Sequence, residues 1–208
     1  MSLSPQEIVI VFALLVMSLS VHEAAHAWTA DRLGDRTARL LGRITLNPLA
    51  HIDWIGTVLF PLLALWSGLP LLGWAKPVPV NMHHLRAPRR DFAIIAAAGP
   101  ASNIVLAVIG ALILRVVYDP AATGQYLMFG ILAQFVALNV ILAVFNMIPV
   151  PPLDGGNVIG GLVGESMARA IDQLRPYGFI IIYALLLTGV LREYVFPIAN
   201  AITRRLLV

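Results

Sequence analysis

Long apolar runs separated by short polar stretches account for most of the chain. Four of these runs cover residues 8–30, 92–117, 126–148 and 177–196, and each has about the length of a membrane span. An α-helix rises about 1.5 Å per residue, so about 20 residues cross a hydrocarbon core of roughly 30 Å. The pattern therefore predicts four spanning helices, the last of which carries Arg192 and Glu193 near its end.

A fifth apolar segment, residues 52–75, differs from the other four in its helix breakers. Pro61, Gly68 and Pro70 interrupt it. Proline removes a backbone hydrogen bond that a continuous helix needs, and glycine marks turns. We expect this segment to re-enter the membrane or to lie at its surface.

The composition supports a membrane protein. Hydrophobic residues make up 59% of the chain and charged residues 12%, which is outside the range of soluble globular domains. No repeat, low-complexity tract or long polar linker divides the sequence. We expect an all-α polytopic membrane protein with a single membrane-embedded domain over residues 1–208, comprising a core at about 8–164 and a C-terminal helix at about 177–196.

The basic residues gather in the middle of the sequence. Eight of the fourteen Lys and Arg fall between Arg32 and Arg90, on both sides of residues 52–75. Lys and Arg concentrate in cytoplasmic loops, so both flanks of this segment are expected in the cytoplasm and the N-terminus outside. Arg204 and Arg205 would then lie outside, which is an exception to the preference of Lys and Arg for the cytoplasmic side. Without interleaved aromatic residues, these charges do not indicate a nucleic-acid partner.

Two stretches near these charges suggest extended backbone. They are ARLLGRITL at residues 38–46 and KPVPVNM at residues 76–82. The alternating prolines of the second permit only edge-strand or polyproline geometry. Together the stretches suggest a small β element on the cytoplasmic side, against which an unwound peptide could pair as an added strand.

The motif HEAAH, residues 22–26, interrupts the first apolar run. On a helix, His22 and His26 project from one face a turn apart and can bind one metal ion. Glu23 lies about 100° around the helix, where it can hold a water molecule beside the metal. Zinc hydrolases use this arrangement, with the glutamate passing a proton from water to the leaving amine. Ionisable residues at membrane depth mark function, which favours a metal site over a chance match.

The two histidines leave a third ligand to find. Catalytic zinc usually has three protein ligands, and the chain has no cysteine to supply one. In NMIPVPPLDGG, residues 146–156, Asp154 follows three prolines that break the helix and precedes two glycines that allow close backbone approach. The aspartate could instead simply cap the next helix. Beside an incomplete two-histidine site we favour the metal role.

A shared metal ion constrains the topology. His22 and Asp154 must lie at the same depth, so an even number of membrane crossings separates them. The runs at 92–117 and 126–148 already supply two crossings. Residues 52–75 are therefore expected not to cross, in agreement with the positive charge on both flanks.

Three motifs in this order resemble the site-2 protease family of intramembrane zinc metalloproteases: HEAAH at 22–26, GPASN at 99–103 and NMIPVPPLDGG at 146–156. The stretches LGRITLNPLAHID and GWAKPVPVN resemble its compact prokaryotic branch, and the 208 residues leave no room for the PDZ or CBS domain of other members. The resemblance implies a zinc metalloendopeptidase.

By this resemblance His22, His26 and Asp154 would bind one Zn²⁺ and Glu23 would be the catalytic acid and base. Asn146 would help to hold the scissile peptide or its oxyanion. Asn103 would have a similar supporting role.

The resemblance also implies a location and a class of substrate. The chain would be a multi-pass protein of the prokaryotic cytoplasmic membrane, with its active site nearer the cytoplasmic face. Its partners would be the lipid bilayer and transmembrane proteins, cut within or near their spans in regulated intramembrane proteolysis. The identity of the substrate, the trigger and the oligomeric state stay open.

Two other functions stay open from the residues alone. One is a non-hydrolytic metal-binding membrane protein or transporter, which has less need of a carboxylate such as Glu23 beside the ion. The other is an HExxH protease of a different family, with Glu165 or Glu193 as its third ligand.

The other histidines have simpler expected roles. His51 is expected to be solvated or to bond a local carbonyl, with metal binding as the alternative. His83 and His84 lie in the basic loop and are expected to meet solvent or lipid headgroups.

Overall fold

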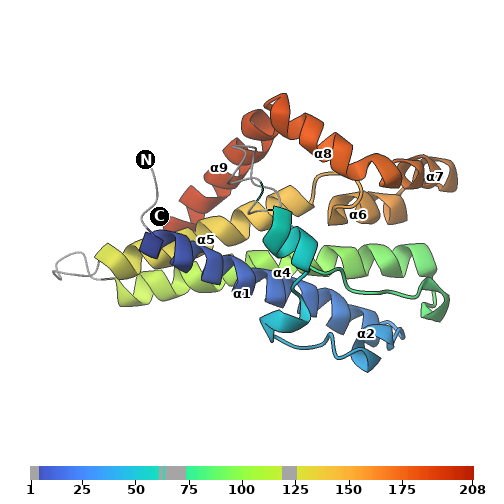
Figure 1. Ribbon diagram of the computed structural model, residues 1–208, viewed down its shortest axis with the longest axis horizontal. Helices are drawn as coiled ribbons and strands as arrows, with labels where there is room; N and C mark the ends of the chain where they lie inside the picture. The colour runs from blue at the N-terminus through green and yellow to red at the C-terminus, as the bar shows by residue number, and fades with distance from the viewer. Residues whose placement is uncertain (1–4, 61–62, 64–73, 119–125) are drawn as a thin grey trace.

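Three long helices lie side by side in the computed structural model, which describes residues 5–60, 63, 74–118 and 126–208 (Figure 1). They are α1 (Pro5–Arg32), α4 (Pro88–Val117) and α5 (Tyr126–Asn146). Helix α4 packs against both of the others. Helices α1 and α5 run in the same direction and α4 in the opposite one. The predicted runs at 8–30, 92–117 and 126–148 therefore form helices within a few residues of their expected bounds.

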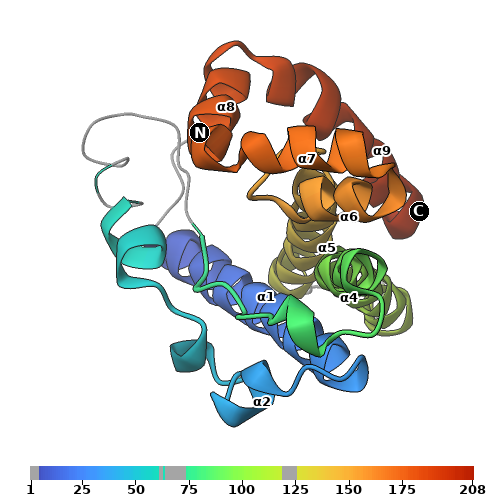
Figure 2. The ribbon, with the colours of Figure 1, turned by 90° about the vertical axis from the view of Figure 1, so that its right-hand side faces the viewer.

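The C-terminal part forms a series of shorter helices. They are α6 (Asp154–Leu162), α7 (Glu165–Gln173), η4 (Arg175–Tyr177), α8 (Gly178–Leu187), η5 (Leu191–Val195) and α9 (Phe196–Leu207). Helix α6 packs on α4, whereas α9 returns to pack on α5. Figure 2 shows this group and the short helix α2 (Thr37–Leu40) on opposite sides of the long helices. The core between α4, α5 and α9 consists of Ala107, Ala111, Val136, Val140 and Ala199.

Four helical stretches of the described chain are long and apolar enough to cross a bilayer: Gln6–Arg32, Pro88–Val117, Leu127–Asn146 and Glu165–Leu187. The chain is therefore an all-α polytopic membrane protein. The fourth stretch differs from the predicted run at 177–196, because α8 ends at Leu187. Gly189 follows with a φ of 81°, a left-handed conformation that ends helices and that residues with a Cβ rarely adopt.

The expected small β element is not formed by the described residues, which contain no strand. Residues 37–40 fold into α2, and the chain then turns at Gly42, whose φ is 67°. Residues 74–81 are extended but pair with no other strand, because Pro77 and Pro79 lack the N–H groups that a ladder needs.

The first described part of the apolar segment 52–75, residues 52–60, lies beside its last described part, residues 74–75. Its first part forms η2 (Trp54–Leu59), a short π-helical stretch. Trp74 N–H donates to the Gly56 carbonyl at 3.2 Å, and the Thr57 hydroxyl donates to the Trp74 carbonyl at 2.8 Å. The end of α1 and the start of α4 also lie at one end of the bundle (Figure 1). That residues 52–75 do not cross the membrane stays a prediction. The predicted helix breakers Pro61, Gly68 and Pro70 lie outside the described residues.

Buried polar groups anchor the extended segment 74–81. Lys76 N–H donates to the His51 carbonyl at 2.8 Å, and the buried Arg43 guanidinium donates to the Lys76 carbonyl. Burial lowers the pKa of Arg43, against the opposing effect of the Glu23 carboxylate. The hydrogen bond from Arg43 therefore ties this segment to the turn after α2.

A fully buried carboxylate, Asp35, ties the turn after α1 to the end of the same segment. It accepts hydrogen bonds from Thr37 N–H (3.0 Å), the Thr37 hydroxyl (2.5 Å), Asn81 N–H (2.7 Å) and His84 Nδ1 (2.9 Å). Burial acts to raise the pKa of Asp35, but these hydrogen bonds outweigh it and hold the pKa below its ordinary value. His84 therefore binds Asp35, a contact that was not expected, while its side chain stays 53% exposed.

Replacing Asp35 should destabilise this corner of the fold. We expect Asp35→Ala to lower the free energy of unfolding by about 2–4 kcal/mol, because buried donors lose their acceptor. Since the folded pKa is depressed, the wild-type contribution is present above the unfolded pKa and is lost as pH falls through the folded value, below about pH 4. Thermal unfolding in detergent between about pH 7 and pH 3 measures both effects.

The exposed Glu193→Gln is the matched control and should unfold as the wild type does. Equal stability of the Asp35→Ala and wild-type proteins at pH 7 would contradict the anchoring role.

Candidate metal centre

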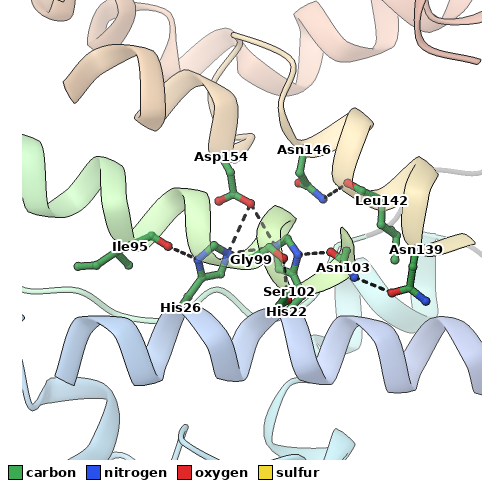
Figure 3. Close-up of polar contacts among 10 residues, drawn as sticks. All are labelled: His22, His26, Ile95, Gly99, Ser102, Asn103, Asn139, Leu142, Asn146 and Asp154. Carbon is green, nitrogen blue, oxygen red and sulfur yellow. Dashed lines mark hydrogen bonds and ion pairs between the residues drawn. The ribbon is translucent and has the colours of Figure 1, made fainter. Parts of the chain in front are cut away.

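The two histidines of HEAAH meet an aspartate from the other side of α4. His22 and His26 are buried on α1, with their Nε2 atoms 3.0 Å apart. Asp154, the first residue of α6, places Oδ2 3.1 Å from His22 Nε2 and 3.4 Å from His26 Nε2 (Figure 3). The structure thus brings together the three residues expected to bind metal, with ligand atoms within 4.8 Å of one another.

The Gly-Gly pair after Asp154 allows the turn that brings it there. A Cβ on Gly155 would lie 2.3 Å from the Met147 carbonyl oxygen, and one on Gly156 would lie 2.7 Å from Pro151 N. Both contacts are with backbone, so no side chain fits at either position without moving the chain. The two glycines were expected to allow a close backbone contact. The structure shows this contact between the start of α6 and the residues that follow α5.

Hydrogen bonds on the far side of each imidazole fix its orientation (Figure 3). His26 Nδ1 lies 2.7 Å from the Ile95 carbonyl oxygen, and His22 Nδ1 lies 2.6 Å from Asn103 Oδ1. A carbonyl oxygen only accepts, so His26 donates from Nδ1, which makes Nε2 the nitrogen that can bind a metal when the ring is neutral.

The orientation of Asn103 follows from a chain of buried amides. Asn139 Nδ2 donates to the Phe135 carbonyl, and to Ser18 Oγ at 3.0 Å, so its Oδ1 is free to accept. Asn103 Nδ2 donates to that oxygen at 2.9 Å. Asn103 Oδ1 therefore faces His22 and accepts a hydrogen bond from its Nδ1, and the Nε2 atoms of His22 and His26 face each other.

These donors match the requirements of zinc. Two nitrogen lone pairs and Asp154 Oδ2, a buried oxygen without a hydrogen-bond donor, face one another at 3.0–3.4 Å. When both rings are neutral, these three atoms can together bind one cation. Bonds of about 2.0–2.1 Å in a tetrahedral zinc site place ligand atoms roughly 3.3 Å apart, and three protein ligands leave the open position of a catalytic site.

Gly99, in the GPASN motif on α4, leaves the space for these donors. A Cβ there would lie 2.4 Å from His26 Nε2 and 2.5 Å from His22 Nε2. Sequence reasoning used Gly99 only as part of a family motif. The carbonyl of Ile95 and the side chain of Asn139 were also missed, although a buried asparagine in an apolar helix is itself a signal of such a contact.

The side chains of His22, His26 and Asp154 open onto a cavity of about 710 Å³. Glu23 and Asn146 line it too, and the Asn146 amide donates to the Leu142 carbonyl at 3.0 Å. Most of its remaining wall is apolar and comes from α1, α4, α5, α8 and the extended segment 74–81. The site therefore combines a metal centre, a carboxylate and an amide in an apolar cavity.

Other candidate residues lie elsewhere. Asn103 is fully buried behind His22 and is not part of the cavity wall. His51 is buried and its Nε2 lies 2.9 Å from the Thr45 carbonyl oxygen, as expected of a histidine that bonds a local carbonyl. Glu165 and Glu193 are exposed and are not members of the metal cluster, which disfavours a glutamate as the third ligand.

The sequence profile described as Peptidase family M50 matches residues 10–122 and 116–189 of the chain. The chain belongs to this family, the site-2 protease family. A Bacillus subtilis protein named "Putative zinc metalloprotease YwhC" is 38% identical over 194 residues, which cover 90% of this chain and 84% of the relative. A Mycolicibacterium smegmatis protein named "Putative zinc metalloprotease Rip2" is 33% identical over 191 residues, covering 91% of this chain and 71% of the relative. No solved structure matches the chain.

Membership in family M50 agrees with the geometry of the cluster. Its zinc metalloprotease relatives imply Zn²⁺ as the cofactor, and His22, His26 and Asp154 have the donor types and spacing that zinc takes. The chain is therefore a multi-pass membrane protein of a zinc metalloprotease family.

Adding a methyl group at Gly99 should displace the metal donors. We expect Gly99→Ala to lose at least about nine-tenths of the bound zinc, because both imidazoles must move and ligand geometry governs zinc affinity. Zinc per chain in detergent-purified protein, measured by elemental analysis, checks this. Gly130→Ala, whose Cβ would meet nothing within 4 Å, is the matched control. Full zinc content in Gly99→Ala would contradict the prediction that a Cβ at position 99 displaces the two imidazoles.

Proposed function

We propose that this protein is an intramembrane zinc metalloendopeptidase that hydrolyses peptide bonds within or near the transmembrane segments of other membrane proteins. The main support is the position of the metal cluster on a spanning helix. His22 lies ten residues before the end of α1 at Arg32, which is about 15 Å inside the helix. A protease acting only on soluble substrates has no need of a site at this depth.

The proposed ligands are His22, His26 and Asp154, with one Zn²⁺ per chain. Bound zinc would supply Lewis acidity, which lowers the pKa of water and polarises a carbonyl group. Glu23 would take the proton from the attacking water and deliver it to the leaving amine. A carboxylate on the cavity wall that is not a ligand suits this proton transfer, and it favours hydrolysis over metal transport.

The two asparagines would have different roles. Asn146 lines the cavity and would donate a hydrogen bond to the scissile carbonyl or to its oxyanion. Asn103 binds His22 Nδ1 from behind, so we assign it to positioning this ligand and not to holding the substrate. Such partners fix the tautomer and orientation of a metal-binding histidine.

The proposed substrate is a membrane segment that unwinds easily. A helix in lipid keeps its carbonyl groups in internal hydrogen bonds, so a bond must be freed before water can attack it. The apolar cavity wall suits the side chains of such a segment, and substrates with helix-breaking residues near the cut are expected.

The proposed location is the prokaryotic cytoplasmic membrane, with the active site nearer the cytoplasmic face. The basic residues between Arg32 and Arg90 include those at the end of α1 and the start of α4. Lys and Arg favour the cytoplasmic side, and the metal cluster lies in the half of α1 nearest to this end.

Replacing Glu23 should separate metal binding from hydrolysis. We expect Glu23→Gln to keep its zinc and to lose at least about a hundredfold in cleavage rate, because the amide cannot accept the proton. The assay uses liposomes that contain the purified protein and a pool of single-span peptides with central Gly and Pro residues. Mass spectrometry identifies new chain ends inside the apolar segment.

Cleavage that is undiminished in Glu23→Gln, or that persists after zinc removal, would contradict the proposed activity. Cleavage only in the polar flanks of the peptides would contradict the intramembrane assignment.

The two asparagines should respond differently to substitution. We expect Asn103→Leu to weaken zinc binding by about 10–100-fold, because His22 loses the acceptor that orients it. Asn146→Ala should keep zinc and lower the cleavage rate by about tenfold or more. Zinc affinity by competition with a chelator and the cleavage rate at saturating zinc separate the two effects. Ser102→Ala, which removes only a hydroxyl that binds the Gly99 carbonyl, is the control for Asn103.

A further inference from the structure

Arg175 stands out in the wall of the metal cavity. Among the described residues that line this cavity it is the only Lys or Arg, in a wall that is mostly apolar and contains the acidic Glu23 and Asp154. Sequence reasoning gave it no role, because it lies in the C-terminal part that no motif covers. A lone cation beside a proteolytic site raises the question of what it binds.

Two hydrogen bonds hold the guanidinium of Arg175 in place. Its Nη2 donates to Asn157 Oδ1 at 2.8 Å, and its Nε donates to Asp172 Oδ1 at 3.0 Å. Asn157 follows Asp154 by three residues on α6, so the two side chains lie on the same face one turn apart. Arg175 is therefore anchored close to a metal ligand, with partners on both α6 and α7.

The anchoring leaves much of the guanidinium free. Arginine has five N–H donors in a planar fork, and the two hydrogen bonds use two of them. The side chain is 45% exposed and the Asp172 side chain 50%. An ion pair as exposed as this one is weak, so Asp172 orients the fork without satisfying it. The other three N–H donors form no hydrogen bond to a described residue, and Arg175 lines the cavity.

Carboxylates fit these donors better than other groups of a polypeptide. A guanidinium fork binds a carboxylate through two parallel charge-assisted hydrogen bonds. The other cavity residues offer little to an acidic side chain, because Glu23 and Asp154 repel it and the apolar wall cannot solvate it. An acidic substrate residue would therefore be tolerated at one place, beside Arg175.

We propose that Arg175 is a specificity-determining residue that binds an acidic side chain of the substrate. Arg175 binds Asn157, which lies one helical turn from Asp154 of the metal centre. The acidic residue would therefore lie about two to four residues from the scissile bond in an extended peptide. Acidic residues are rare inside spans. Arg175 would therefore direct cleavage to bonds near the end of a span, where an Asp or Glu can enter the cavity. This inference rests on the proposed function.

The test measures binding, so that it does not depend on turnover. The probes are single-span peptides with amidated ends that differ only in one residue, Glu or Gln, placed at each position of the segment in turn. Fluorescence anisotropy gives the Kd of each peptide for zinc-loaded Glu23→Gln protein. At the favoured position we expect the Glu peptide to bind about tenfold more tightly than the Gln peptide.

Substitution of Arg175 should change the ratio of the two Kd values, that of the Gln peptide divided by that of the Glu peptide. In Arg175→Gln the ratio should fall to about one, and in Arg175→Glu it should invert, with a Lys peptide now favoured. Arg169→Gln removes a cation that binds only the Glu165 carbonyl and does not line the cavity, so it should leave the ratio unchanged. Asn157→Ala removes one anchor but keeps the positive charge, and the Glu peptide should remain the tighter ligand.

The results separate this inference from the proposed function. A ratio near one at every position in the Arg175-containing protein, or an equal loss of Glu and Gln peptide binding in Arg175→Gln, would overturn the recognition role and leave only a structural link between α6 and α7. Cleavage of the Gln peptides by the protein with Glu23 intact tests the proposed function independently of Arg175.

Discussion

The structure depends on three electron-rich atoms that face one another in a buried place. His22 Nε2, His26 Nε2 and Asp154 Oδ2 lie 3.0–3.4 Å apart. The hydrogen bonds at Nδ1 of both imidazoles orient the rings so that their Nε2 atoms face each other. A zinc ion bound by these three atoms would link α1 to α6. Membership in family M50 implies this zinc.

Helix α4 makes this meeting possible, although it contributes no ligand. Its Ile95 carbonyl and Asn103 amide hold the two imidazoles, and Gly99 leaves room for their Nε2 atoms. The amide chain through Asn139 extends the support to α5 and to Ser18 on α1. The three long helices are thus fitted to one another around the metal ligands, and their packing and the site geometry are parts of one arrangement.

The long helices and the residues of the metal cluster could be predicted from the sequence, because hydropathy and side-chain chemistry can be read within a single segment. The spans around α1, α4 and α5 and the HEAAH ligands follow from apolar runs and helical spacing, and Asp154 follows from the lack of a third ligand. The end of α8 at Leu187, the folding of residues 37–40 into α2 and the contact of Arg175 with Asn157 depend on tertiary packing. No pattern within a single segment carries that information.

The most direct test of the account is the zinc content of purified wild-type protein and of Asp154→Ala. Asp172→Ala, which removes an exposed aspartate outside the cluster, is the matched control. The account predicts about one zinc per chain in the wild type and in Asp172→Ala, and a clear loss in Asp154→Ala. A wild type that binds no metal, or an Asp154→Ala protein that keeps it fully, would contradict the three-ligand centre.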